Sequence, residues 1–133
     1  MEYLIGVAVG LGVCVFTSLV GMDRDRALYP TMMIVIALLY DLFAAIGGSN
    51  QALVMEAAAG VIFIGLAVAG FRSSLWFTVV GLIGHGIFDL AHPLIIQNPG
   101  VPTWWPAFCL SADVAIGAYL AVLILRDRVR PVT

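Results

Sequence analysis

The sequence predicts an all-α membrane protein, a five-transmembrane-helix bundle that forms one integral membrane domain over residues 1–133. The chain is 62% hydrophobic with a mean hydropathy of +1.09, which is more apolar surface than one small water-soluble core can bury. Its apolar residues fall into five runs, each close to the roughly 20 residues that a helix needs to cross the hydrocarbon core. All six basic residues lie outside these runs.

The five runs are separated by segments that stop helices. DRDRALYP, GGSNQ, RSS and QNPGVPTWWP stand between consecutive runs, and each consists largely of turn formers, charges or prolines. The second run is the shortest, so a start near residue 27 is the alternative there. Pro93 is expected to kink or loosen the end of the fourth helix. The predicted helices cover residues 3–21, 31–46, 52–71, 75–96 and 107–125.

The basic residues predict the orientation in the membrane. All six are arginines, and with five spans they fall on one side, whereas three or four spans would split them between the two sides. An excess of arginine marks the cytoplasmic side. The N-terminus is therefore predicted to lie outside and the C-terminus in the cytoplasm. The arginines follow the first, third and fifth runs, at Arg24, Arg26, Arg72, Arg126, Arg128 and Arg130.

Ionisable residues inside the runs lie at similar depths. With this orientation, four carboxylates fall in the outer half of the membrane, about 6–11 Å below the outer interface, with His92 slightly shallower and His85 near the midplane. A charge near the bilayer centre costs about 2.5–3.5 kcal/mol, so these groups are expected to face one another rather than lipid. Because every arginine lies on the far side, protons, a metal or a cationic ligand must neutralise them. The carboxylates are Asp41, Glu56, Asp89 and Asp113.

Helical spacing places several of these residues on shared faces. His85, Asp89 and His92 fall within about 60° of arc on the fourth helix. Cys109 and Asp113 are four residues apart on the fifth helix and share a face there. Imidazole with carboxylate ligands favours zinc, iron or manganese over calcium or magnesium. The predicted mononuclear ligands are His85, Asp89, His92 and Asp113, the candidate general bases are Glu56 and Asp41, and the other pocket residues are Cys109, Thr78 and Gly81.

A dinuclear centre is the alternative, because four carboxylates and two histidines match the ligand inventory of the di-iron carboxylate bundles. Those bundles use two Glu-x-x-His pairs, however, and this chain has one similar pair, Asp89-x-x-His92. The mononuclear centre is therefore the preferred prediction.

One combination of motifs resembles a known group of proteins. His85-x3-Asp89-x2-His92, followed by Asn98-Pro99, Trp105-Pro106 and Cys109-x3-Asp113, is similar to small multi-pass bacterial membrane proteins grouped as a domain of unknown function. The resemblance covers roughly the last 50 residues. It implies that these residues belong together, and it implies no activity. We expect the chain to be a multi-pass protein of a cell membrane, the bacterial inner membrane.

Three functions are compatible with these residues. The first is a metal-dependent enzyme, a hydrolase or oxidoreductase, that acts on a lipid or another apolar molecule. The second is a transporter or sensor for protons, metal ions or an organic cation. The third is a structural or accessory subunit whose polar residues hold helices together. The inner half offers few polar side chains, namely Thr17, Ser18, Thr31 and Thr78, which favours a one-sided pocket over a transport path.

The expected partners follow from these functions. They are membrane lipids, an apolar or cationic small molecule, and a second copy of the chain that would complete the site in a homo-oligomer. No nucleic-acid partner is expected.

Overall fold

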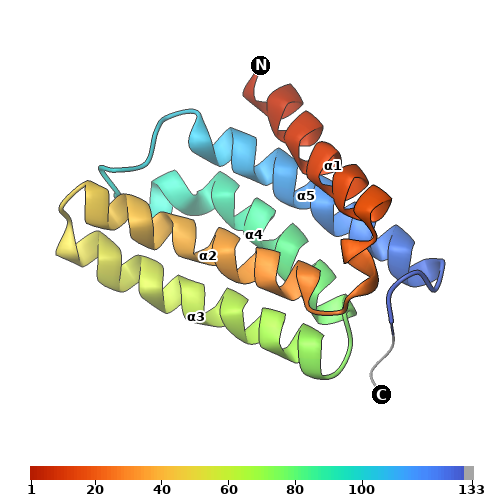
Figure 1. The fold of residues 1–133 in the computed structure, drawn as a ribbon. Coiled ribbons are helices and arrows are strands. Elements are labelled where there is room, and N and C mark those ends of the chain that lie inside the picture. The colour runs from red at the N-terminus through yellow and green to blue at the C-terminus, as the bar shows by residue number, and fades with distance from the viewer. Residues whose placement is uncertain (131–133) are drawn as a thin grey trace.

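The computed structural model describes residues 1–130, and its five long helices follow one another in the predicted order (Figure 1). Each is long and apolar enough to cross a membrane, which confirms the predicted all-helical class. Every predicted bound lies within three residues of the observed one. The elements are α1 (Glu2–Val20), the short 3-10 helix η1 (Met22–Arg24), α2 (Leu28–Ile46), α3 (Asn50–Arg72), α4 (Trp76–Ile95) and α5 (Trp105–Leu125).

Local sequence explains where the helices begin and end. Gly21 terminates α1 in the left-handed conformation, with a φ of 85°, which glycine adopts without steric cost. Ser49 caps α3, because its Oγ accepts a hydrogen bond from the Ala52 N–H at 3.1 Å. Pro93 lies in the last turn of α4, and Pro106 lies in the first turn of α5, where a missing N–H costs nothing.

Small residues bring the helices together. Helix α5 packs against both α1 and α4, α4 packs against α3, and α3 packs against α2. A Cβ atom on Gly10 would lie 2.9 Å from the Ala112 carbonyl oxygen, and one on Gly86 would lie 3.1 Å from the Leu110 carbonyl oxygen. These two glycines therefore allow α1 and α4 to approach α5 closely, as small residues do in membrane bundles.

Apolar side chains cover the outside of the bundle, and ionisable side chains turn inward. Leu4, Phe16, Val61 and Leu94 are each more than 60% exposed. In a water-soluble protein such residues would form the core, so this distribution matches a lipid-facing surface. The buried polar and charged side chains are Thr17, Asp23, Glu56, Thr78, His85, Asp89, His92 and Asp113.

The arginines gather at one end of the bundle. The Arg26 guanidinium donates hydrogen bonds of 2.6–2.9 Å to three carbonyl oxygens at the end of α3 and just after it. The Arg130 N–H donates to the Arg24 carbonyl oxygen at 3.3 Å, which brings the segment after α5 to the same place. At the opposite end, Asn98 Nδ2 donates to the Tyr40 carbonyl oxygen at 3.0 Å and ties the α4–α5 loop to α2. We call these two ends the arginine end and the loop end.

Candidate functional site

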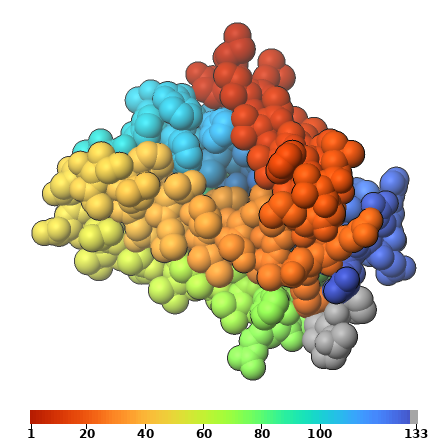
Figure 2. All heavy atoms as spheres, viewed as in Figure 1, coloured from red at the N-terminus to blue at the C-terminus, as the bar shows by residue number. Residues whose placement is uncertain are grey.

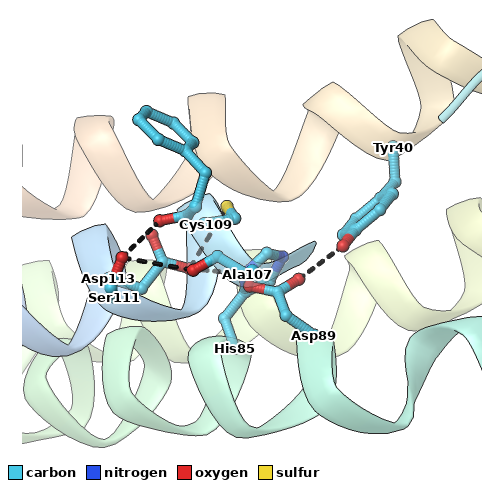
Figure 3. Close-up of polar contacts among 8 residues, drawn as sticks. Tyr40, His85, Asp89, Ala107, Cys109, Ser111 and Asp113 are labelled. Atoms are coloured by element: carbon cyan, nitrogen blue, oxygen red, sulfur yellow. Dashed lines mark hydrogen bonds and ion pairs between the residues drawn. The ribbon is translucent and has the colours of Figure 1, made fainter. Parts of the chain in front are cut away.

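Helices α4 and α5 bring four potential metal ligands together in the interior (Figure 3). One ligand atom from each of His85, Asp89, Cys109 and Asp113 lies within 4.8 Å of the others, and all four residues are buried. His85 Nδ1 lies 2.7 Å from Asp113 Oδ2 and 3.6 Å from Asp89 Oδ2. Cys109 Sγ lies 3.7 Å from Asp113 Oδ2. We call these four residues the α4–α5 group.

Helical periodicity and small residues position this group. His85 and Asp89 are four residues apart on α4, and Cys109 and Asp113 are four apart on α5, so each pair points to one side of its helix. Gly86, one residue beyond His85, lies against α5 and lets the two helices approach. The predicted shared faces of His85 with Asp89 and of Cys109 with Asp113 are therefore present.

A second group lies at the end of α4 nearer the loop. His92 Nε2 lies 2.6 Å from Glu56 Oε1 of α3, and Asn98 Nδ2 donates to the same oxygen at 2.9 Å. Both His92 and Glu56 are 2% exposed. We call these three residues the loop-end group. Its hydrogen bonds join α3, α4 and the α4–α5 loop.

Tyr40 of α2 lies between the two groups. Its hydroxyl donates a hydrogen bond of 2.6 Å to Asp89 Oδ1 (Figure 3). Its ring stacks on the His92 imidazole with a centroid separation of 3.9 Å and an interplanar angle of 15°. Phe63 packs edge-on against His85, at 4.8 Å between ring centroids. The imidazoles are thus held between aromatic rings, which restricts their orientation.

The structure brings together three of the four predicted metal ligands. His85, Asp89 and Asp113 meet, whereas His92 turns to Glu56 in the loop-end group. Cys109, expected as another pocket residue, lies within the group of potential metal ligands instead. Glu56, expected as a general base, lies inside the bundle, and its Oε1 accepts from two donors.

The remaining predicted site residues point elsewhere, namely Asp41, the second candidate general base, and the pocket residues Gly81 and Thr78. Asp41 is half-buried and faces α3 near Gly60, and its Oδ2 has no hydrogen-bond partner among residues 1–130. Gly81 packs against Leu66 and Met33. Thr78 lies against Gly70 of α3. The sequence places the four carboxylates at similar depths in the membrane, but they do not share one pocket. Each lies on a different helix, and the helices turn them in different directions.

Tyr40 and Asn98 are the residues of the site that sequence reasoning missed. Tyr40 belongs to a buried face of α2 marked by apolar and small residues at helical spacing, and that periodicity is the signal that points to it. The face comprises Tyr29, Met33, Ala37, Tyr40 and Ala44. Asn98 falls in a loop and belongs to the Asn98-Pro99 motif, which gave it no expected role in the site.

No arginine within residues 1–130 forms a salt bridge with a carboxylate of either group. The two histidines are the basic side chains that do. Asp89 Oδ2 is buried and receives no hydrogen bond in the described part of the chain, since 3.6 Å from His85 Nδ1 is too long for one. A buried carboxylate oxygen without a donor is costly, so this atom is a natural position for a further ligand.

Two cavities reach the site from different directions. A cavity of about 610 Å³ at the loop end is lined by His92 and Asn98 together with prolines of the α4–α5 loop and its flanks. A second cavity, of about 320 Å³, lies between α2 on one side and α1 and α5 on the other, and Cys109 and Asp113 form part of its wall. We call the second one the side cleft. In Figure 2, atoms of α5 are seen recessed between α1 and α2.

The interior on the arginine side of the α4–α5 group is mainly apolar. Met33, Leu82, Ile116 and Leu120 belong to one buried hydrophobic cluster there. Further polar contacts occur near the arginine end, where Ser18 Oγ lies 2.7 Å from the Tyr119 hydroxyl and also contacts Asp23. An apolar layer therefore lies between the polar site and that end.

Comparisons with models of protein families, with curated proteins and with solved structures gave no match for this chain. The interpretation of the site therefore depends on its geometry and chemistry.

Proposed function

We propose that the α4–α5 group binds a divalent transition metal, and that the protein is a metal-dependent membrane enzyme acting on a lipid or another apolar molecule. The observation that carries this proposal is the convergence of four buried ligand atoms within 4.8 Å. The orphaned Asp89 Oδ2 supports it independently, because a metal would supply the missing partner.

The chemistry of the four residues favours zinc. Zinc takes thiolate, imidazole and carboxylate ligands in tetrahedral sites, at about 2.3 Å from sulfur and about 2.0–2.2 Å from nitrogen and oxygen. Ligand atoms around such an ion lie about 3.5 Å apart. The distances of 3.6 and 3.7 Å already match, and the His85–Asp113 contact of 2.7 Å would need to lengthen by less than an ångström. The widest separation in the group, up to 4.8 Å, would need to shorten. Cys109 takes the place that His92 had in the ligand set expected from spacing.

Residues around the group have complementary roles in this proposal. With all four side chains bound, a substrate oxygen or a water molecule would have to enter as a fifth ligand, and the metal would supply Lewis-acid chemistry there. Tyr40 holds Asp89 in position through its hydroxyl. The His92–Glu56 pair lies beside the loop-end cavity and would exchange a proton with a polar reactant there. Asp41, whose side chain faces α3, has no role in this arrangement.

The membrane setting is part of the proposal. The chain would cross a bacterial inner membrane five times, with the arginine end in the cytoplasm and both groups in the outer half. The apolar layer around Met33 and Leu120 supports a one-sided site rather than a transport path to the cytoplasm.

A structural role is the second candidate, and the two histidine–carboxylate contacts favour it. The His85–Asp113 and His92–Glu56 contacts are 2.7 and 2.6 Å long, which is the length of a strong hydrogen bond. Such contacts would hold α3, α4 and α5 together without a metal. A subunit of this kind would purify metal-free and would need no thiol at position 109.

Metal content separates the two candidates. Protein purified in detergent is expected to contain close to one equivalent of zinc, and Asp113→Asn and Cys109→Ser are each expected to lose most of it. Cys14→Ser is the matched control, since Cys14 is also buried but lies on α1 outside the group. His92→Ala should retain zinc, because His92 contacts Glu56 instead. Metal-free wild-type protein, or equal zinc in the Cys109 and Cys14 variants, would reject the metal centre.

A further inference from the structure

The side cleft opens to the outside of the bundle, where a membrane protein meets hydrocarbon. Val9 of α1 and Val35 of α2 both line it, and they are 45% and 55% exposed. Figure 2 shows the recess between these helices on the molecular surface. In a bilayer, molecules diffusing in the membrane plane would reach this opening without passing through water.

The shape of the cleft fits an extended apolar chain. Its α2 wall runs from Leu28 to Leu39, which is about 16 Å along a helix. Its α5 wall runs from Trp105 to Ile116, again about 16 Å. A groove of about 320 Å³ with walls of this length offers room for one flexible chain.

The lining excludes most polar ligands. Its residues are apolar except for Thr31, Cys109 and Asp113, so a ligand with several polar groups would leave most of them without hydrogen-bond partners. Trp105 also lines the cleft at its loop end, and the indole N–H of this residue is buried with no acceptor in residues 1–130. Cys109 and Asp113 are buried as well, so the polar atoms of the lining contribute almost nothing to the surface of the cleft.

We propose that the side cleft holds a single acyl chain of a membrane lipid, which extends along the apolar walls of α2 and α5 and passes beside Cys109 and Asp113. This inference rests on the proposed function, which gives the α4–α5 group its role as a metal centre. It deepens that function by naming the substrate class. Binding in such a groove depends on close packing, because moving a lipid tail from the surrounding hydrocarbon into an apolar groove yields little hydrophobic free energy. A side chain that fills the groove should therefore abolish occupancy.

Photolabelling in vesicles tests this proposal. The protein is reconstituted, free of metal, in phosphatidylglycerol and phosphatidylcholine vesicles that contain a small fraction of phospholipid with a diazirine on one acyl chain. After illumination, adducts are mapped by mass spectrometry. Adducts are expected to concentrate on the cleft residues Met32 and Val35, and to fall several-fold in Leu39→Trp, which places an indole in the cleft. Val35→Trp provides a second filling variant should Leu39→Trp fail to fold.

Leu38→Trp is the matched control. It makes the same change one residue away on an exposed part of α2, and it should leave the adducts on Met32 unchanged. Equal labelling of cleft residues and outward residues such as Leu42, or no effect of either filling variant, would overturn the proposal. A cleft covered by a second copy of the chain would show no adduct on Met32, which also overturns it.

The two proposals fail in distinguishable ways. Adducts are measured without metal, and zinc content is measured without labelled lipid. Loss of cleft labelling with zinc retained rejects the acyl-chain site alone. Cleft labelling in a protein that never binds zinc rejects the metal centre alone.

Discussion

His85 of α4 and Asp113 of α5 meet in the middle of the bundle, with Nδ1 and Oδ2 2.7 Å apart and both side chains shielded from solvent. The contact crosses the α4–α5 interface, where Gly86 and Gly117 allow the two helices to approach. It therefore depends on helix packing as much as on the two residues themselves. That dependence allows the site to be perturbed without changing any of its ligands.

Gly86→Val tests how far helix packing positions the site. A Cβ on Gly86 would already lie 3.1 Å from the Leu110 carbonyl oxygen, so valine must push α5 away from α4. Overpacking of this kind costs about 1–3 kcal/mol. We expect lower thermal stability in detergent and reduced zinc content. Gly84→Val is the control, because a Cβ there meets nothing within 4 Å. Equal stability of the two variants would show that close approach of α4 and α5 is unnecessary.

Tyr40→Phe tests the link between the two polar groups. The change removes the hydroxyl that donates to Asp89 Oδ1 and leaves the ring stacked on His92. An unpaired buried acceptor costs about 1–3 kcal/mol, so the variant should unfold at a lower temperature by circular dichroism. Tyr3→Phe is the control, since Tyr3 is 50% exposed. An unchanged unfolding temperature for Tyr40→Phe would indicate that Asp89 does not need this donor.

Cysteine labelling tests the orientation of the bundle. Asn50 and Ser73 are exposed residues next to the α2–α3 and α3–α4 turns, at the loop end and the arginine end respectively. In intact cells a membrane-impermeant maleimide should label Asn50→Cys and should reach Ser73→Cys only after the cells are broken. Both native cysteines are buried and should stay unlabelled. The opposite pattern would invert the proposed topology.

The helices could be predicted from the sequence because each apolar run has the length of a membrane span and ends at a residue that stops a helix. The shared face of His85 and Asp89 was predictable for the same reason, since it depends only on spacing within one helix. The start of α2 was the least certain bound, and the helix begins at Leu28, close to the alternative start near residue 27.

The pairing of side chains between helices could not be predicted, because depth in the membrane does not specify how each helix is rotated. Asp41 follows Tyr40 directly, about 100° further around α2, so when Tyr40 occupies the interior Asp41 must turn toward α3. His92 lies outside the α4–α5 group and meets Glu56, because the loop end of α4 lies against α3. Cys109 thereby becomes the fourth member of the α4–α5 group.

X-ray absorption at the zinc edge tests the central claim most directly. For zinc-loaded protein in detergent, the account predicts one sulfur neighbour at about 2.3 Å and nitrogen or oxygen neighbours at about 2.0–2.2 Å, with the sulfur signal lost in Cys109→Ser and retained in Cys14→Ser. A zinc environment without sulfur in the wild-type protein, or a sulfur signal that survives Cys109→Ser, would contradict it.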